Sequence, residues 1–238
     1  MSHEYDKTIA HHYKVYRPPL HKIILEKAIN IDAKYKNGLD IGCGTGYSSV
    51  ALADYCDYVI GVDPSQEMID QAINHRLVSY YLGSGDCLPD GIDKIDIVCF
   101  AGSLFYTKSP KLIGELKRVC KDNCLIIVYD FMVILDELLK ELHIFPPMTD
   151  ETYNHEINFD DCNGFIGMSG NIAQILLKIN PSELAHVLMS DSKRYNLFVE
   201  RFQATDPYPF LVKKLEASNI PLEIKVNTYL YVYQMIKY

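Results

Sequence analysis

The chain has 238 residues and a formal net charge of −8, and 48% of its residues are apolar. This length and apolar share suffice for one α/β domain of ordinary size with an added segment. The acidic balance argues against nucleic acid as a partner, because phosphate binding needs clustered Lys and Arg. No apolar run approaches the roughly 20 residues of a membrane helix, so we expect no membrane partner.

The seven cysteines and the first residues bear on the cellular compartment. Residues 1–7 lack the basic-then-apolar pattern of a secretory signal peptide. Most cysteines lie in apolar contexts that suit buried, reduced thiols, namely Cys56, Cys87, Cys99, Cys120 and Cys124. Cys120 and Cys124 have no second cysteine pair or histidine pair nearby, so we expect no metal site. We therefore expect a cytoplasmic protein that is a monomer or a homodimer.

The first 130 residues alternate between apolar strands and helices. After an amphipathic beginning over 8–30, with a helix at 20–29, five short apolar runs are expected as strands, at 37–41, 58–62, 78–82, 95–100 and 125–130. Helices are expected between them, at 46–54, 65–75 and 109–120. Strands joined through helices predict a parallel sheet with right-handed connections. The near-continuous apolar character of 95–100 is typical of a strand buried on both faces.

The regular alternation stops after residue 130. Residues 131–205 look mainly helical, and a helix is expected at 207–218. Two final strands, 222–227 and 228–236, are expected to form an antiparallel hairpin. We therefore divide the single domain 1–238 into an N-terminal helical or lid segment 1–35, a core 36–130, a helical insertion 131–205, and a C-terminal helix and hairpin 206–238.

A glycine-rich turn follows the first expected strand. Asp40 is followed by glycines at alternate positions, Gly42, Gly44 and Gly46. Glycine removes the Cβ atom where a backbone bends tightly or where a ligand lies against the main chain. The second expected strand ends on Asp63, 17 positions after Gly46. Because neighbouring strand ends meet at one crevice of a doubly wound sheet, an acid there can hold both hydroxyls of a ribose.

This pair of motifs resembles the class I S-adenosylmethionine-dependent methyltransferases, whose motif is E/D-x-G-x-G-x-G. The resemblance covers residues 36–130 strongly and the remainder weakly. It implies a Rossmann-like, doubly wound α/β sheet of seven strands, mostly parallel with an antiparallel last strand, and S-adenosyl-L-methionine as the cofactor. A nicotinamide-dinucleotide site is the competing interpretation, but it normally shows G-x-G-x-x-G, and here the third glycine comes one residue early.

The resemblance also implies roles for individual residues. Asp63 would accept from the ribose hydroxyls, unless it only caps the helix after it. Asp40 would orient the turn and reach the methionine amino group, unless it is a simple solvated acid. Asp86 and the backbone N–H of Cys87 would contact adenine, unless they only close a turn, and Met68 would pack on its face, unless it is a core residue. The expected cofactor-binding set is Asp40, Gly42, Cys43, Gly44, Gly46, Asp63, Pro64, Met68, Asp86, Cys87, Ala101 and Ser103.

Two further segments resemble a subgroup that includes the trans-aconitate methyltransferases. Residues 101–106 resemble its A-x-x-L-H-W, with Phe105 and Tyr106 at the His-Trp positions, which removes a candidate base. The segment before Pro18 resembles its A-x-x-Y-x-x-x-R-P through Tyr13 and Arg17, which would close over the cofactor. The candidate substrate-positioning residues are therefore Tyr13, Arg17, Phe105 and Tyr106.

We expect the 131–205 insertion and the N-terminal segment to form a lid, with Tyr153 and Phe159 in the acceptor pocket. His143, His155, Asp160 and Asp161, also in the insertion, are expected as surface residues. The leading functional hypothesis is transfer of a methyl group to a small-molecule substrate. Methylation of a macromolecule, and a non-catalytic cofactor-binding module or partner subunit, remain as alternatives.

Overall fold

The computed structural model describes residues 8, 12, 16, 18–146, 153–218 and 220–237. The chain divides into two compact units, which are described separately. The first, called the sheet unit, comprises Pro19–Phe131, Tyr153–Ala173 and Thr228–Tyr238. The second, called the helical unit, comprises Met1–Pro18, Met132–Thr152 and Gln174–Asn227.

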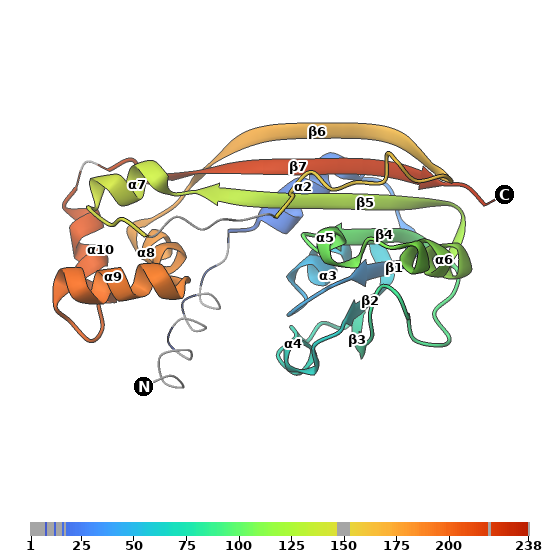
Figure 1. Cartoon of the computed structure of the whole chain (residues 1–238), viewed down its shortest axis with the longest axis horizontal. Helices are drawn as coiled ribbons and strands as arrows, with labels where there is room; N and C mark the ends of the chain where they lie inside the picture. Colours follow the sequence, from blue (N-terminus) through green and yellow to red (C-terminus); the bar gives the residue numbers. More distant parts are fainter. Residues whose placement is uncertain are drawn as a thin grey trace. The chain divides into compact units, whose positions relative to one another are not determined.

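A seven-stranded sheet has the order β3-β2-β1-β4-β5-β7-β6 (Figure 1). Its strands are β1 (Tyr35–Ile41), β2 (Cys56–Asp63), β3 (Val78–Leu82), β4 (Ile95–Ala101), β5 (Cys120–Ile134), β6 (Phe165–Lys178) and β7 (Glu223–Met235). The first five strands pair in parallel, and the β5-β7-β6 end is antiparallel. The predicted sheet with its antiparallel last strand is confirmed.

The strands of the sheet unit form where the apolar runs were predicted. The central strands are covered on both faces, whereas the edge strand β3 exposes Tyr81 and Leu82. Leu39, Val98 and Ile126 on three neighbouring strands are completely buried. The helices of this unit are α2 (Leu20–Ala28), α3 (Tyr47–Leu52), α4 (Gln66–Asp70), α5 (Leu104–Thr107) and α6 (Pro110–Val119). Leu112 and Leu116 of α6 are buried in the same cluster as the strand residues. This core fixes the strand ends that carry the candidate site.

Helix α4 is shorter than the predicted helix over 65–75. It begins as predicted after Ser65, whose side chain accepts from the N–H of Met68 at 3.3 Å. Two contacts then hold the chain at Ile73. Its N–H donates to the Thr45 carbonyl at 3.0 Å, and its carbonyl accepts from the Tyr80 hydroxyl at 2.9 Å. Because Ile73 is held by the glycine turn and by β3, a helix does not continue through it.

The helical unit contains α7 (Asp136–Glu141), α8 (Pro181–Met189), α9 (Ser192–Phe202) and α10 (Tyr208–Glu216). Helix α8 begins with a capping box between Asn180 and Glu183, which satisfies backbone donors that a helix start leaves open. Buried apolar side chains from α8, α9 and α10 form the core of this unit, among them Leu184, Leu188, Phe198, Leu211 and Leu215.

Two predictions for the second half of the chain are wrong. Residues 165–178, predicted as helical, form β6, whose Gly167 and Gly170 and alternating exposed apolar residues suit a strand better than a helix. The predicted hairpin at 222–236 is one continuous strand, β7. Its burial alternates with a period of two through Asn227 and Thr228, so no turn interrupts it.

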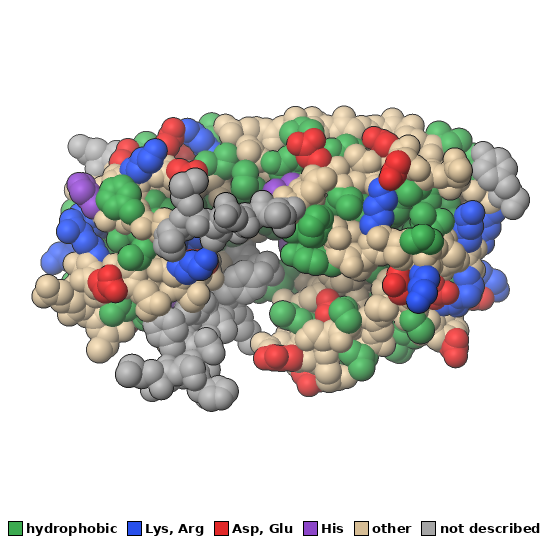
Figure 2. Space-filling model, in the orientation of Figure 1, with side chains coloured by type: hydrophobic (Ala, Val, Ile, Leu, Met, Phe, Trp, Pro, Cys, Tyr) green, Lys and Arg blue, Asp and Glu red, His purple; other side chains and the backbone are tan. Residues whose placement is uncertain are grey.

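Surface and thiol properties complete the description. Among the residues that the structure describes, no helix is long and apolar enough to cross a membrane. Cys56, Cys99, Cys120 and Cys124 are buried as predicted, whereas Cys87 is exposed because it lies in a turn after β3. On the face drawn in Figure 2, Lys and Arg side chains lie among Asp and Glu side chains. Examples of ion pairs are Arg118 with Glu115 at 2.6 Å and Lys121 with Asp96 at 2.5 Å.

Candidate cofactor and acceptor site

The glycine turn after β1 has a backbone that other residues adopt with strain. Gly42, Gly44 and Gly46 have φ values of 74°, 52° and 86°. A Cβ atom at Gly42 would overlap Ser103, and one at Gly46 would overlap the hydroxyl of Tyr80. A Cβ atom at Gly44 would meet nothing within 4 Å. Packing therefore explains the outer two glycines, while the middle one faces open space.

Strand β2 holds this turn in place. The N–H groups of Gly42 and Cys43 both donate to the Val62 carbonyl, at 2.8 and 3.1 Å. The N–H of Gly44 donates to Oδ2 of Asp63 at 2.8 Å, and the N–H of Ser65 donates to Oδ1 at 2.9 Å. Asp63 is 9% exposed. Its carboxylate thus joins the glycine turn to the start of α4, and since a carboxylate has about four acceptor positions, acceptor capacity remains.

Asp40 lies beneath the turn and is completely buried. Its Oδ2 accepts from the hydroxyls of Ser48 and Ser49 at 2.7 and 2.6 Å, which ties β1 to α3. Its Oδ1 is buried without a hydrogen-bond partner among the described residues. Burial raises the pKa of this carboxyl from 3.8 to about 6, and the two serine hydrogen bonds oppose that rise. The predicted role in orienting the turn fits this placement.

The residues predicted to contact adenine lie after β2 and β3. Met68 is 44% exposed, so it is not a core residue. Pro64 precedes it at the exposed start of α4. Asp86 accepts from the hydroxyl of Ser109, and the N–H of Cys87 donates to the Ser84 carbonyl at 3.1 Å. The turn-closing alternative therefore describes Cys87 in this structure, and its N–H would have to be shared or released to bind adenine.

The segment after β4 joins the glycine turn to a second group of polar residues. Ser103 packs over Gly42 and donates to the Ile41 carbonyl. Its neighbour Gly102 has a φ of 69°, and a Cβ atom added there would lie 3.1 Å from Oδ1 of Asp130. Ala101 pairs with Tyr129 in the parallel register of β4 and β5, which places Asp130 just beyond the end of β4. Ser103 thus contacts the glycine turn, and the adjacent Gly102 contacts the Asp130 group.

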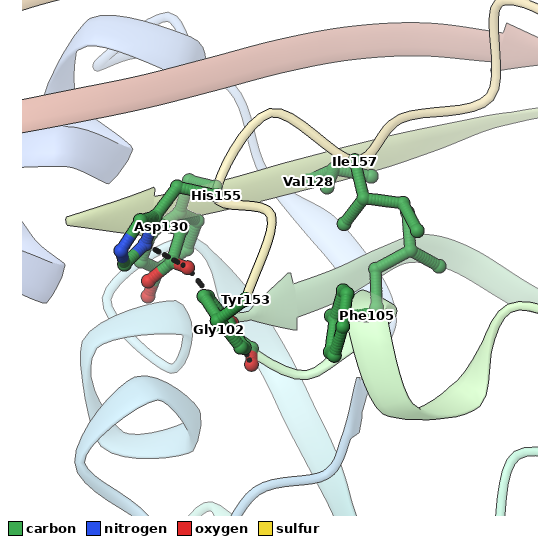
Figure 3. A pocket seen from close by; sticks show the side chains of 9 residues that line it. Gly102, Phe105, Val128, Asp130, Tyr153, His155 and Ile157 are labelled. Carbon is green, nitrogen blue, oxygen red and sulfur yellow. Dashed lines mark hydrogen bonds and ion pairs between the residues drawn. The ribbon is translucent and has the colours of Figure 1, made fainter. Parts of the chain in front are cut away.

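A small pocket lies at this second group (Figure 3). Oδ2 of Asp130 lies 2.8 Å from Nδ1 of His155 and 2.8 Å from the hydroxyl of Tyr153. The same hydroxyl is 2.8 Å from the Gly102 carbonyl. Oδ1 of Asp130 accepts from the N–H of Phe131 at 2.7 Å. A single carboxylate therefore holds an imidazole and a phenol at the carboxyl ends of the strands.

Aromatic rings surround these polar groups. The His155 ring stacks on Tyr229, with centroids 5.3 Å apart and planes 10° apart. The ring centroid of Tyr153 lies 4.7 Å from that of Phe105 and 5.6 Å from that of Tyr106. Tyr106 is 76% exposed. Burial, and then the nearby charge of Asp130, raise the pKa of Tyr153. Phe105 lines the pocket and Tyr106 lies at its outer side, so the structure brings these two predicted positioning residues to one place.

Other sequence expectations are placed differently. Tyr13 and Arg17 lie outside the described residues. Phe159, predicted in the acceptor pocket, is completely buried in the core, where it stacks on Phe165 at 4.3 Å. His155, predicted as a surface residue, lines the pocket because Asp130 binds it. Sequence reasoning missed this pair, whose members are 25 positions apart across an irregular segment.

Comparisons with known proteins agree with this geometry. A family model described as a methyltransferase domain matches residues 39–123. A Dictyostelium discoideum protein is 28% identical over 65% of this chain and 61% of its own length. Its name calls it a methyltransferase and gives no substrate. The ubiquinone biosynthesis O-methyltransferase of Coxiella burnetii is 33% identical over 39% of this chain and 44% of its own length. The chain thus spans about half the length of the curated relatives it matches.

Solved structures share the fold. A structure named as a type II methyltransferase from Anaeromyxobacter dehalogenans aligns with a TM-score of 0.58 and 19% identity. The alignment covers 93% of this chain and 98% of that one. The YcgJ protein of Bacillus subtilis aligns with a TM-score of 0.53 and 18% identity, over 92% and 99%. With its glycine turn, its strand-end acid and this sheet order, the chain has the fold of the class I S-adenosylmethionine-dependent methyltransferases, and its residues 39–123 match a methyltransferase domain.

Proposed function

We propose that this protein binds S-adenosylmethionine along the glycine turn and transfers its methyl group to a small molecule held at the Asp130 pocket. The observation that carries the proposal is Gly44. Its positive φ and the open space beside it are unexplained by packing, whereas Gly42 and Gly46 are needed to fit Ser103 and Tyr80. A bare backbone facing open space is what a ligand lying against the main chain requires.

The residues present fit this cofactor. Asp63 has acceptor capacity left for two ribose hydroxyls beside the N–H groups that it already binds. Among the described residues Oδ1 of Asp40 has no hydrogen-bond partner, so an acceptor next to the turn is left for the amino group of the cofactor. Exposed Met68 and Pro64 border the side assigned to adenine. When bound, the cofactor supplies an activated methyl group, so the protein mainly provides proximity, alignment and exclusion of water.

Placement of the acceptor follows from the strand ends. Gly102 contacts the Asp130 group while Ser103 packs on Gly42 of the turn, so an acceptor at the pocket would lie beside the cofactor end held by the turn. The acidic chain, and the mixture of charge signs on the face in Figure 2, favour a small molecule over nucleic acid. The homologue whose name gives an O-methyltransferase activity on a biosynthetic small molecule supports the same class.

Mass spectrometry would test this proposal directly. The protein is incubated with a metabolite extract and S-adenosylmethionine that carries an isotope-labelled methyl group. Labelled small products are the expected result. Labelled proteins or nucleic acids would instead support a macromolecular substrate, and binding without any labelled product would support a non-catalytic module. The Gly44→Val variant is the control, because it should abolish labelling by filling the space beside the turn.

A further inference from the structure

We infer that His155 is the general base of this protein and that its acceptor is a hydroxyl on an aromatic ring, a phenol. The inference rests on the proposed methyl transfer and names the chemistry of its acceptor. The Phe105-Tyr106 pair lacks a histidine, and His155 supplies the base from a distant part of the chain.

The hydrogen bond that His155 donates to Asp130 fixes the tautomer of the imidazole. An ionised carboxylate only accepts, so Nδ1 of His155, 2.8 Å from Oδ2, carries the proton. In this tautomer Nε2 presents a lone pair. No described residue forms a hydrogen bond with Nε2, and the His155 side chain is 24% exposed at the pocket. A histidine held by a carboxylate on one nitrogen and open on the other is the arrangement of a general base.

The surroundings of His155 hold this orientation. Tyr229 of β7 stacks on one face of the ring, and Tyr153 packs edge-on at 4.7 Å. Asp130 of β5 is the charged group that faces it, and Tyr106 lies beyond Tyr153. Asp130 is therefore a positioning residue, since it acts through the imidazole and is itself already occupied by Tyr153 and Phe131.

The pocket lining narrows the class of acceptor. The titratable residues that line the pocket are Asp130, His155, Tyr129 and Tyr153. None of the described lining residues is Lys or Arg. A carboxylate acceptor would meet the charge of Asp130 without a Lys or Arg beside it, and it has no proton for a base to remove. The rings of Phe105, Tyr106 and Tyr153 instead form an aromatic cluster beside the pocket, against which a flat ring can stack. A hydroxyl group on such a ring would point into the small pocket.

The reaction step balances with these groups. Nε2 of His155 takes the hydroxyl proton while an oxygen lone pair forms the new carbon–oxygen bond. The carbon–sulfur bond breaks, and its electron pair remains on sulfur. The imidazolium that results is stabilised by the Asp130 carboxylate and returns its proton to solvent. A base matters here because a phenol, with a pKa near 10, is mostly protonated at neutral pH.

Binding of 4-nitrophenol tests the inference without turnover, because its phenolate absorbs visible light. The probe is titrated with pH while bound to the protein in the presence of S-adenosylhomocysteine. We expect the phenolate signal of the bound probe to appear about one pH unit lower than in free solution, a roughly tenfold rise in its acidity. His155→Gln should remove this shift. Asp130→Asn should reduce it, because an amide can hold the wrong imidazole tautomer.

Calorimetry with S-adenosylhomocysteine and a thermal melt accompany each titration, and His143→Gln, at an exposed histidine of the helical unit, is the matched control. An unshifted titration in the unmodified protein, an equal shift in a folded His155→Gln or Asp130→Asn variant, or failure of the probe to bind while S-adenosylhomocysteine binds would each overturn the inference. Failure of S-adenosylhomocysteine itself to bind the unmodified protein would instead overturn the proposed function.

Discussion

The contribution of the buried Asp40 carboxyl to the stability of this protein should rise as the solution becomes mildly acidic. The group is completely buried, and burial raises its pKa from 3.8 to about 6. The folded state therefore binds a proton more tightly than the unfolded state does. Between these two pKa values folding takes up a proton, so the contribution of Asp40 to the free energy of unfolding increases as pH falls.

The size of this effect follows from the two pKa values. A difference of about two units corresponds to about 3 kcal/mol between a fully ionised and a fully protonated carboxyl. Between pH 7 and pH 5, where the folded form goes from mostly ionised to mostly protonated, the gain is about 1 kcal/mol. Surface carboxylates act in the opposite direction. The pKa values of Asp96 and Glu115 are lowered by hydrogen bonds to Lys121 and Arg118, so their contribution to stability is lost as pH falls.

Urea denaturation of the unmodified protein and of Asp40→Asn, at pH 7 and at pH 5, isolates the effect. The variant keeps the shape of the side chain but cannot titrate, and both proteins share every other carboxylate. We expect the unmodified protein to gain about 1 kcal/mol relative to the variant on going from pH 7 to pH 5. Equal pH dependence in the two proteins would refute the argument that burial of Asp40 dominates its ionisation.

Three further predictions concern the glycines and a helix start. Gly44→Ala and Gly91→Ala should each lower the free energy of unfolding by about 1 kcal/mol, since both have positive φ and open space around the new Cβ, yet only the former should weaken S-adenosylhomocysteine binding in calorimetry. Equal binding by both variants would mean that the ligand does not lie against the glycine turn. Gly46→Ala should cost at least about 2 kcal/mol more than Gly91→Ala in urea denaturation, because its Cβ would overlap a tyrosine hydroxyl. Asn180→Ala should cost about 1 kcal/mol through loss of the α8 capping box, and an unchanged urea midpoint would contradict this.

The cofactor half of the molecule could be predicted from the sequence because its signals are local. Apolar strands buried on both faces differ clearly from their neighbours, and the glycines around Gly44 identify a turn by their spacing. Asp63 could be added because parallel strands end at one edge of a sheet. Each of these inferences needs only a short stretch of chain and a general rule of sheet topology.

The proposed acceptor pocket and the strand β6 could not be predicted, because long-range contacts determine their structure. His155 follows no periodic pattern, and only its hydrogen bond to Asp130 distinguishes it from a surface histidine. Phe159 was misplaced because an aromatic residue in an irregular segment serves equally well in a pocket or in a core, and here contacts with Phe165 and Tyr233 place it in the core. The β6 strand was missed because neighbouring β7 supplies its hydrogen bonds.

Calorimetric titration with S-adenosylhomocysteine tests the central claim most directly. The account predicts binding in the micromolar range, roughly −7 to −9 kcal/mol, in preference to NAD. Asp63→Ala should weaken it by roughly 1.5–3 kcal/mol through loss of hydrogen bonds to a charged group. Asp57→Ala, an exposed acid at the opposite end of the same strand, should leave it unchanged. Folded, unmodified protein that binds no S-adenosylhomocysteine, or that binds NAD instead, would contradict the account.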